Sequence, residues 1–276
     1  MSDYKLIAIN LDGTLLNDNN RISKENLCAI SKLKDLGVNV APCTGRSIAE
    51  ILDAVKNNPD IRYIIYSNGA VVFDKLTNST IKACISNKTA LKLFEILSQY
   101  QVHYTIRANG NCYIEKGSAD CHNVSFYNII PSHNDVIKNY STEIEDFSTW
   151  KSSRDDIEVV AVFFHNLDEK ARCKKQLSKI DEILFVEACE SNFEILSKDA
   201  GKGAGLASLS RLIGVEKNSV IGVGDSGNDI PMMQSAGMRL AVSNATEELK
   251  KMCDKTICSN NEHAVQYILD NFINKN

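Results

Sequence analysis

Short apolar runs that end in polar turns recur near both ends of the chain. Residues 6–9 lead into Asn10, and residues 219–224 lead into Asp225. Runs of this length with little polar alternation are typical of strands that are buried on both faces of a parallel sheet. Amphipathic segments separate the runs, so the pattern predicts an α/β fold with a doubly wound parallel sheet.

The expected helices of this fold begin and end at recognisable residues. Residues 21–36 carry apolar side chains at helical spacing, with Ser23 as the N-cap and Gly37 just beyond the C-terminus. A second helix is expected over residues 47–55. Further strands are expected at 38–41, 63–66 and 240–242, and further helices at 202–214, from about 230, at 247–253 and at 264–272.

The rhythm changes in the middle of the chain, where hairpins and single helices replace the strand–helix alternation. The expected elements are a hairpin over 70–85, a helix over 88–100, paired strands over 103–107 and 111–115, a polar loop over 117–156, a strand over 158–164 and a helix over 167–179. We therefore expect an inserted α+β domain over residues 84–188. Residues 1–83 and 189–276 then form the Rossmann-like core.

Length, charge and cysteine use narrow the class of protein. The 276 residues can bury one large core or two modest ones, and the net charge of −4 comes without a dense basic block. Nucleic acid is not an expected partner, because its phosphates are bound by clustered positive charge. We expect neither a signal peptide nor a membrane span, because residues 1–5 lead straight into a short expected strand and no apolar run approaches the roughly 20 residues of a span. The nine cysteines form no CxxC pair, which favours reduced thiols in a cytoplasmic protein.

Polar residues that suit phosphate chemistry follow the expected strands. They are Asn10 and Asp12 after the first strand, Thr44 and Gly45 after the second, Lys202 at a helix start, and Asp225, Asn228 and Asp229 after the strand at 219–224. The carboxyl ends of parallel strands meet at one edge of a sheet, where ligands bind. Phosphoryl transfer needs a nucleophile, neutralisation of the phosphate oxygens and an acid for the leaving group. Carboxylate oxygens also suit Mg²⁺.

Four ordered motifs resemble those of the haloacid dehalogenase superfamily. They are Asn10-Leu11-Asp12-Gly13-Thr14, Thr44-Gly45-Arg46, Gly201-Lys202-Gly203 and Asp225-Ser226-Gly227-Asn228-Asp229. The position and α+β pattern of the insertion resemble the cap of the Cof-type, sugar-phosphatase-like subfamily. The resemblance implies a phosphatase whose partner is a small phosphorylated metabolite, mostly a sugar phosphate. It leaves the oligomeric state open.

The resemblance also implies a role for each motif residue. Position 10 would accept the phosphoryl group as an aspartyl-phosphate, and Asp12 would be the general acid and base. Mg²⁺ would be held by position 10, the Asp12 carbonyl and Asp225. The phosphate would be bound by Leu11, Thr44, Gly45, Lys202 and Asn228, and Asp229 would steady the lysine or a metal-bound water.

The chain departs from the family at position 10, where Asn10 replaces the expected aspartate. A neutral amide is a poor nucleophile, so we expect activity to be lost or greatly impaired. Either an active phosphatase carries an inactivating substitution, or the chain is a natural non-catalytic relative that binds a phosphorylated ligand. The other motifs are intact, which favours the first interpretation. A phosphomutase of the same fold is a further alternative.

One stretch also matches a dinucleotide-binding signature. Gly222, Gly224 and Gly227 satisfy the GxGxxG spacing after a buried strand. However, this strand comes late in the chain, whereas the dinucleotide turn usually belongs to the first strand–helix unit. Asp225 would also stand where a pyrophosphate approaches. A nucleotide cofactor is therefore not expected, and the dispersed histidines predict no metal site of their own.

Overall fold

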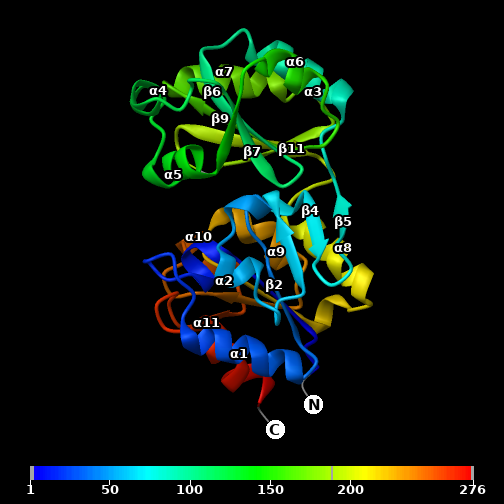
Figure 1. Ribbon diagram of the computed structural model, residues 1–276. Helices are drawn as coiled ribbons and strands as arrows, with labels where there is room; N and C mark the ends of the chain where they lie inside the picture. The colour runs from blue at the N-terminus through cyan, green and yellow to red at the C-terminus, as the bar shows by residue number, and fades with distance from the viewer. Residues whose placement is uncertain (1–2, 188, 275–276) are drawn as a thin grey trace. The chain divides into compact units, whose positions relative to one another are not determined.

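The computed structural model describes residues 3–187 and 189–274, which divide into two compact units (Figure 1). Unit 1 combines the chain up to Gly45 with Ile51–Lys82 and the chain from Gly201 onward. Unit 2 consists of Arg46–Glu50 and Ala83–Ala200. The main chain therefore passes between the units at 45/46, 50/51, 82/83 and 200/201.

Unit 1 contains the strands β1 (Leu6–Ile9), β2 (Asn39–Pro42), β3 (Tyr63–Tyr66), β4 (Val71–Asp74), β5 (Ser79–Lys82), β12 (Val220–Gly224), β13 (Met238–Ala241) and β14 (Lys255–Thr256). Its α-helices are α1 (Lys24–Asp35), α2 (Asp53–Lys56), α8 (Lys202–Ile213), α9 (Ile230–Gln234), α10 (Glu247–Met252) and α11 (Ala264–Ile268). Tighter or wider helical turns lie at Leu11–Leu15, Ser67–Gly69, Lys217–Ser219, Gly227–Asp229 and Leu269–Ile273.

Unit 2 contains the strands β6 (Val102–Ala108), β7 (Asn111–Glu115), β8 (Ser141–Ile144), β9 (Ile157–Phe164), β10 (Ile183–Val186) and β11 (Asn192–Ser197). Its helices are the 3₁₀ turn Ile48–Glu50, α3 (Asn87–Leu97), α4 (Cys121–Phe126), α5 (Pro131–Tyr140), α6 (Phe147–Ser152) and α7 (Leu167–Leu177). Across the described part of the chain, no helix has the length and apolar character needed to cross a membrane.

A five-stranded parallel sheet forms the centre of unit 1, in the order β14-β13-β12-β1-β2. In β1, Leu6 lies opposite Asn39 on one side and Val220 on the other, and the whole strand is buried. Burial on both faces explains why its run is apolar at every position. The prediction of a parallel sheet here is confirmed. A single parallel bridge between Cys43 and Ile65 joins β3 to this sheet, and β3 also pairs antiparallel with β4 of the predicted hairpin.

The helices of unit 1 end largely where the sequence indicated. Ser23 caps α1 by accepting a hydrogen bond from the Asn26 amide, and Gly37 follows the helix with a φ of 76°. Gly214 ends α8 in the left-handed conformation. Helices α1 and α11 lie side by side (Figure 1), and the Asn26 side-chain oxygen accepts from the Val265 amide at 3.0 Å.

The prediction of one continuous helix over residues 47–55 is wrong. The chain forms one 3₁₀ turn at Ile48–Glu50, is irregular at 51–52 and then forms the short helix α2. Glu50 is fully buried and accepts from the Arg107 guanidinium of unit 2 at 3.0 Å. A continuous helix does not form because the turn packs in unit 2, whereas α2 packs in unit 1.

Unit 2 is built on a six-stranded sheet with the order β10-β11-β9-β6-β7-β8. Its strands pair antiparallel, except for the parallel pair of β7 and β8. The strands β6 and β7 meet at the turn predicted around Asn109 and Gly110. A core that includes Leu93, Val160 and Phe193 lies between the sheet and helices α3 and α7. The predicted α+β character of the middle of the chain is confirmed.

Two expectations for this middle part differ from the structure. The loop predicted over residues 117–156 is wrong, because α4, α5, β8 and α6 occupy most of it. Asp120 and Asp146 cap α4 and α6, although apolar periodicity is weak there. Unit 2 also extends to Ala200, because β11 pairs with β9 and β10. The boundary predicted at residue 188 lies outside the described residues.

Candidate active site

The carboxyl ends of β1 and β12 bring two segments of the site together. The strands run parallel with Ile9 opposite Val223, and the Asn10 amide donates to the Val223 carbonyl at 2.9 Å. Asn10 and Asp225 therefore leave the sheet at the same edge, although 215 positions separate them. This edge is where ligands bind in open parallel sheets.

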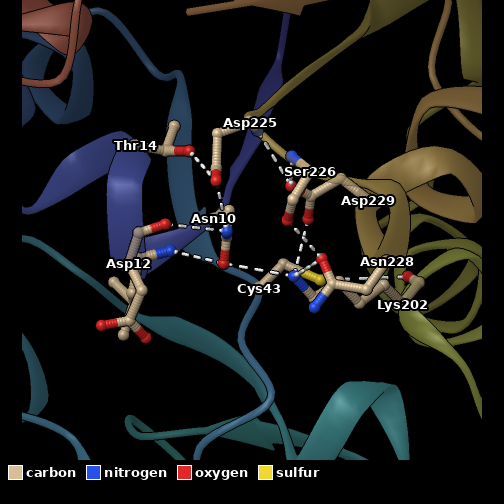
Figure 2. Close-up of polar contacts among 10 residues, drawn as sticks. Asn10, Asp12, Thr14, Cys43, Lys202, Asp225, Ser226, Asn228 and Asp229 are labelled. Carbon is tan, nitrogen blue, oxygen red and sulfur yellow. Dashed lines mark hydrogen bonds and ion pairs between the residues drawn. The ribbon is translucent and has the colours of Figure 1, made fainter. Parts of the chain in front are cut away.

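The buried Asn10 side chain is hydrogen-bonded through both of its ends (Figure 2). Its oxygen accepts from the Leu11 amide at 2.8 Å and from the Lys202 ammonium at 3.2 Å. Its nitrogen donates to Asp225 Oδ1 at 2.8 Å and to the Asp12 carbonyl at 3.0 Å. These partners fix the orientation of the amide, because a flipped amide would set its nitrogen against two donors and its oxygen against two acceptors.

Asp225 is a largely buried carboxylate held by short hydrogen bonds. Its Oδ1 accepts from Asn10 Nδ2 and from the Thr14 hydroxyl, each at 2.8 Å. Burial raises the pKa of Asp225, and the nearby Asp229 carboxylate raises it further. Gly13 has a φ of 69°, and a Cβ there would lie 2.9 Å from Asp225 Oδ2. Glycine is therefore required where the first motif approaches this carboxylate.

Lys202 brings a positive charge into this network. The side chain is almost fully buried, and its Nζ lies 2.6 Å from Oδ1 of the buried Asp229. Nζ also donates to Oδ1 of Asn10 and of Asn228, the latter at 3.4 Å. Burial favours a lower pKa for Lys202, but the nearby acidic groups, Asp229 foremost and Asp225 among them, together raise the pKa, so the ammonium stays charged. Asp229 also offsets the unfavourable position of a lysine at the start of α8.

Asp229 connects this ammonium to the turn after β12. Its Oδ2 accepts from the main-chain amides of Asp225 at 3.0 Å and Ser226 at 3.3 Å. The Ser226 hydroxyl donates to Asn228 Oδ1 at 3.0 Å. A Cβ on Gly224 would lie 2.4 Å from Asp229 Oδ2, so this close approach also requires glycine. The last motif is therefore folded around the Asp229 carboxylate.

The remaining predicted residues lie at the ends of β1 and β2. Asp12 is exposed, and its carboxylate points away from the Asn10 amide in Figure 2. Thr44 is fully buried, and its amide donates to the Ile65 carbonyl at 2.9 Å. Its neighbour Cys43 donates to the Lys202 carbonyl with an Sγ–O distance of 3.9 Å, which places the end of β2 beside the start of α8. Gly45 follows Thr44 in a bend of the main chain.

Four structural contributors were missed by sequence reasoning. Thr14 and Ser226 lie inside the motifs, so their hydroxyl groups at polar turns are signals that could have been used. Asn244 donates to the Gly13 carbonyl at 2.8 Å from 231 positions away, and no local pattern marks it. Burial raises the pKa of the Cys43 thiol to about 12, so this thiol is neutral and not a nucleophile.

The predicted Mg²⁺ ligands meet at one corner of the site. Asp225 Oδ1 and the Asp12 carbonyl oxygen converge there, but the group from position 10 that faces them is the Asn10 nitrogen. Mg²⁺ takes oxygen ligands, and an amide N–H₂ group presents hydrogens instead. Within residues 3–187 and 189–274, no cluster of three or more His, Cys, Asp or Glu residues could hold a metal. The residues as they stand do not fit Mg²⁺.

The profile of the haloacid dehalogenase-like hydrolase family matches residues 7–269. The chain belongs to this family. The match spans all four motifs and the segment between the second and third motifs, so the resemblance seen in the sequence is confirmed.

Relatives of this chain align with almost its whole length. YwtE of Bacillus subtilis, a 5-amino-6-(5-phospho-D-ribitylamino)uracil phosphatase, is 28% identical over 98% of each chain. TM0651 from Thermotoga maritima has a similar crystal structure, with 26% identity, a TM-score of 0.81 and 97% of each chain covered. The subclass IIB sugar phosphatase BT4131 shares the fold at 18% identity, with a TM-score of 0.79 over 97% of this chain and 98% of that one. The predicted haloacid-dehalogenase fold class is confirmed.

Proposed function

We propose that this site is that of a phosphatase for small phosphomonoesters, with position 10 as the point of phosphoryl transfer, and that Asn10 impairs it. The observation that carries the proposal is the buried Lys202 ammonium, which Asp229 holds against the Asn10 side chain at the end of β1. A preorganised positive charge beside the reacting group stabilises the charge of a phosphoryl-transfer transition state. An aspartate in place of Asn10 would add the nucleophile.

The proposal assigns the other motif residues by their position. Asp12 is the general acid and base, and its exposed carboxylate suits a group that exchanges protons with substrate and water. The phosphate-binding residues are Leu11 through its amide, Thr44, Gly45, Lys202 and Asn228. Asp229 positions the ammonium of Lys202.

Mg²⁺ belongs to this proposal for the Asn10→Asp form. There the cation would be held by position 10, the Asp12 carbonyl and Asp225, all through oxygen atoms. When bound, it would neutralise charge on the phosphate. In the chain with Asn10, the nitrogen that faces the other two oxygens prevents this ligand set.

The substrate class is proposed from the family and from a named relative. YwtE is a phosphatase of a phosphorylated ribitylaminouracil, and that substrate is a small phosphomonoester on a sugar-like chain. We assign a small phosphorylated metabolite, such as a sugar phosphate, to this chain as well. A cytoplasmic location is part of the proposal, and the free, exposed thiol of Cys28 agrees with it.

Hydrolysis of p-nitrophenyl phosphate in MgCl₂ tests the proposal. Asn10→Asp should raise the rate by at least about a thousandfold, because no neighbouring group can replace a missing covalent nucleophile. The matched control is Asn19→Asp, which adds the same charge at an exposed position and should leave the rate unchanged. A folded Asn10→Asp protein that releases no phosphate from a broad panel of phosphomonoesters would contradict the proposal.

Asn10 itself favours a second candidate, a non-catalytic protein that binds a phosphorylated ligand. This candidate predicts that both forms bind the same phosphorylated ligand and that neither turns it over. Calorimetric titration combined with the phosphate-release assay separates the two functions. Transfer of phosphate to a second site on the product, followed by ³¹P NMR, would instead indicate a phosphomutase.

A further inference from the structure

The Asn10 nitrogen occupies the corner of the site where two oxygens converge (Figure 2). It lies 2.8 Å from Asp225 Oδ1 and 3.0 Å from the Asp12 carbonyl oxygen. An amide nitrogen carries two hydrogens, so each of these oxygens receives one of them. The corner is closed by hydrogen bonds within the chain.

An aspartate at position 10 would leave the same corner without these donors. Its second carboxylate oxygen would face Asp225 Oδ1 and the Asp12 carbonyl oxygen, with the Thr14 hydroxyl as the remaining donor described for Asp225 Oδ1. Three converging oxygens, two of them from carboxylates, repel one another unless a cation lies between them. With asparagine at position 10 the two oxygens are bridged by amide hydrogens, whereas with aspartate they would need a cation.

We infer that the Asn10 amide takes the place of a divalent cation, so that this chain assembles its site without metal and binds divalent cations weakly. The fixed orientation of the amide supports this, because turning its oxygen toward the corner would break its bonds to the Leu11 amide and the Lys202 ammonium. A cation that enters must break these bonds or displace the nitrogen. The comparison with Asn10→Asp rests on the proposed function, because it takes the metal ligands from that proposal.

Binding of Mn²⁺ alone, followed by the electron paramagnetic resonance signal of the free ion, tests the inference. Asn10→Asp should bind Mn²⁺ at least about tenfold more tightly than the chain with Asn10, because even groups that only support a metal ligand change the affinity by about 10–100-fold. Asn19→Asp carries the same added charge at an exposed position and should bind like the chain with Asn10. Equal Mn²⁺ affinity of the Asn10 and Asn10→Asp proteins would overturn the inference.

Asn10→Ala separates the role of the amide hydrogens from that of charge. It has the same net charge as the chain with Asn10, but it removes the nitrogen from the corner. Our inference expects Asn10→Ala to bind Mn²⁺ more tightly than the Asn10 protein. If affinity follows net charge alone, with a gain in Asn10→Asp and none in a folded Asn10→Ala, the amide is not a cation substitute.

Thermal unfolding gives an independent measurement if Asn10→Ala does not fold. In EDTA, Asn10→Asp should melt roughly 3 °C or more below the Asn19→Asp control, and saturating Mn²⁺ should reverse the loss. The Asn10 protein should melt at the same temperature in EDTA and in Mn²⁺. An Asn10→Asp protein that is as stable in EDTA as the control would contradict the inference. Catalysis is not read in these experiments, so a revertant that binds Mn²⁺ but hydrolyses nothing contradicts the proposed function alone.

Discussion

Lys202 and Asp229 are buried together, and each charge depends on the other. A buried ion is costly without a partner, because burial removes its hydration. The Asp229 carboxylate compensates Lys202 at 2.6 Å and also accepts from two main-chain amides of its own turn. At the residue scale, this pair therefore supports both the charge of the site and the shape of the last motif.

Lys202→Met should lower the free energy of unfolding by about 3–5 kcal/mol, because it leaves Asp229 buried without its cation. Urea denaturation measures the loss. Lys34→Met is the matched control, since Lys34 is about half exposed and its pair with Asp60 lies at the surface. That control should cost less than about 1 kcal/mol. Equal losses in the two variants would show that the buried pair is not coupled as described.

His103 makes stability depend on pH. It is buried beside the rings of Tyr127 and Phe163, and burial lowers its pKa to about 4. In the unfolded chain its pKa is about 6.5, so between pH 6.5 and 4 the unfolded state binds a proton that the folded state does not. The contribution of neutral His103 to the free energy of unfolding is therefore fully present above pH 6.5. It decreases as the pH falls from 6.5 to 4, by up to about 3 kcal/mol.

His103→Phe removes this titration and keeps an aromatic ring among aromatic neighbours. The slope of unfolding free energy against pH between 6.5 and 4 should become flatter than in the parent chain. Urea denaturation at half-unit pH steps measures the slope. An unchanged slope would mean that His103 takes up its proton over the same pH range in the folded and unfolded states, so that burial does not shift its pKa.

The segment Arg46–Glu50 shows at the element scale how one side chain can redirect the main chain. Glu50 accepts from Arg107, which also donates to Glu194 at 2.8 Å, and all three side chains are buried. The Ala49 amide donates to the Gly110 carbonyl at 3.0 Å. These contacts place the segment in unit 2, although the chain on both sides of it belongs to unit 1.

Glu50→Ala should destabilise unit 2 by about 1–3 kcal/mol, because the Nε and Nη2 donors of Arg107 lose the Glu50 carboxylate as acceptor, although Glu194 still compensates the charge. Amide hydrogen exchange of β6 and β9 measures the loss. Glu145→Ala is the control, because Glu145 is 79% exposed and pairs with Lys116 at the surface. If exchange in β6 and β9 responds alike to both substitutions, the network does not hold the segment.

The strand β1 and the segment 117–156 show where local sequence patterns predict secondary structure well and where they do not. The run at β1 predicts its strand well because every position is apolar and the strand is buried on both faces. The prediction of a loop over 117–156 fails because the helices there are short and carry few apolar positions, so their periodicity is faint. Residues that favour helix starts are nevertheless present there. Asp120 and Asp146 are N-caps of α4 and α6, and Pro131 is the first residue of α5.

At the scale of the whole molecule, each unit has its own central sheet and its own buried core. Separate cores allow separate cooperative unfolding, because most buried contacts of a residue lie within its own unit. Leu6 is fully buried in the sheet of unit 1, and Phe193 is fully buried in the core of unit 2.

Leu6→Ala and Phe193→Ala should each cost about 3–5 kcal/mol through the cavity that remains. Native-state hydrogen exchange should show the loss of protection for Leu6→Ala in β1 and β12, and for Phe193→Ala in β9 and β11. Loss of protection in both units by either substitution would show a single cooperative unit instead.

The sequence by itself determined the parallel sheet of unit 1, the α+β character of unit 2, the family, and the placing of Asn10 and Asp225 at strand ends. These follow from apolar runs, caps and turn residues, which act over a few neighbouring positions. Only the tertiary structure decided the orientation of the Asn10 amide, the pairing of Lys202 with Asp229 and the assignment of Arg46–Glu50 to unit 2. Each depends on groups far apart in the chain, whose approach is set by strand register and burial.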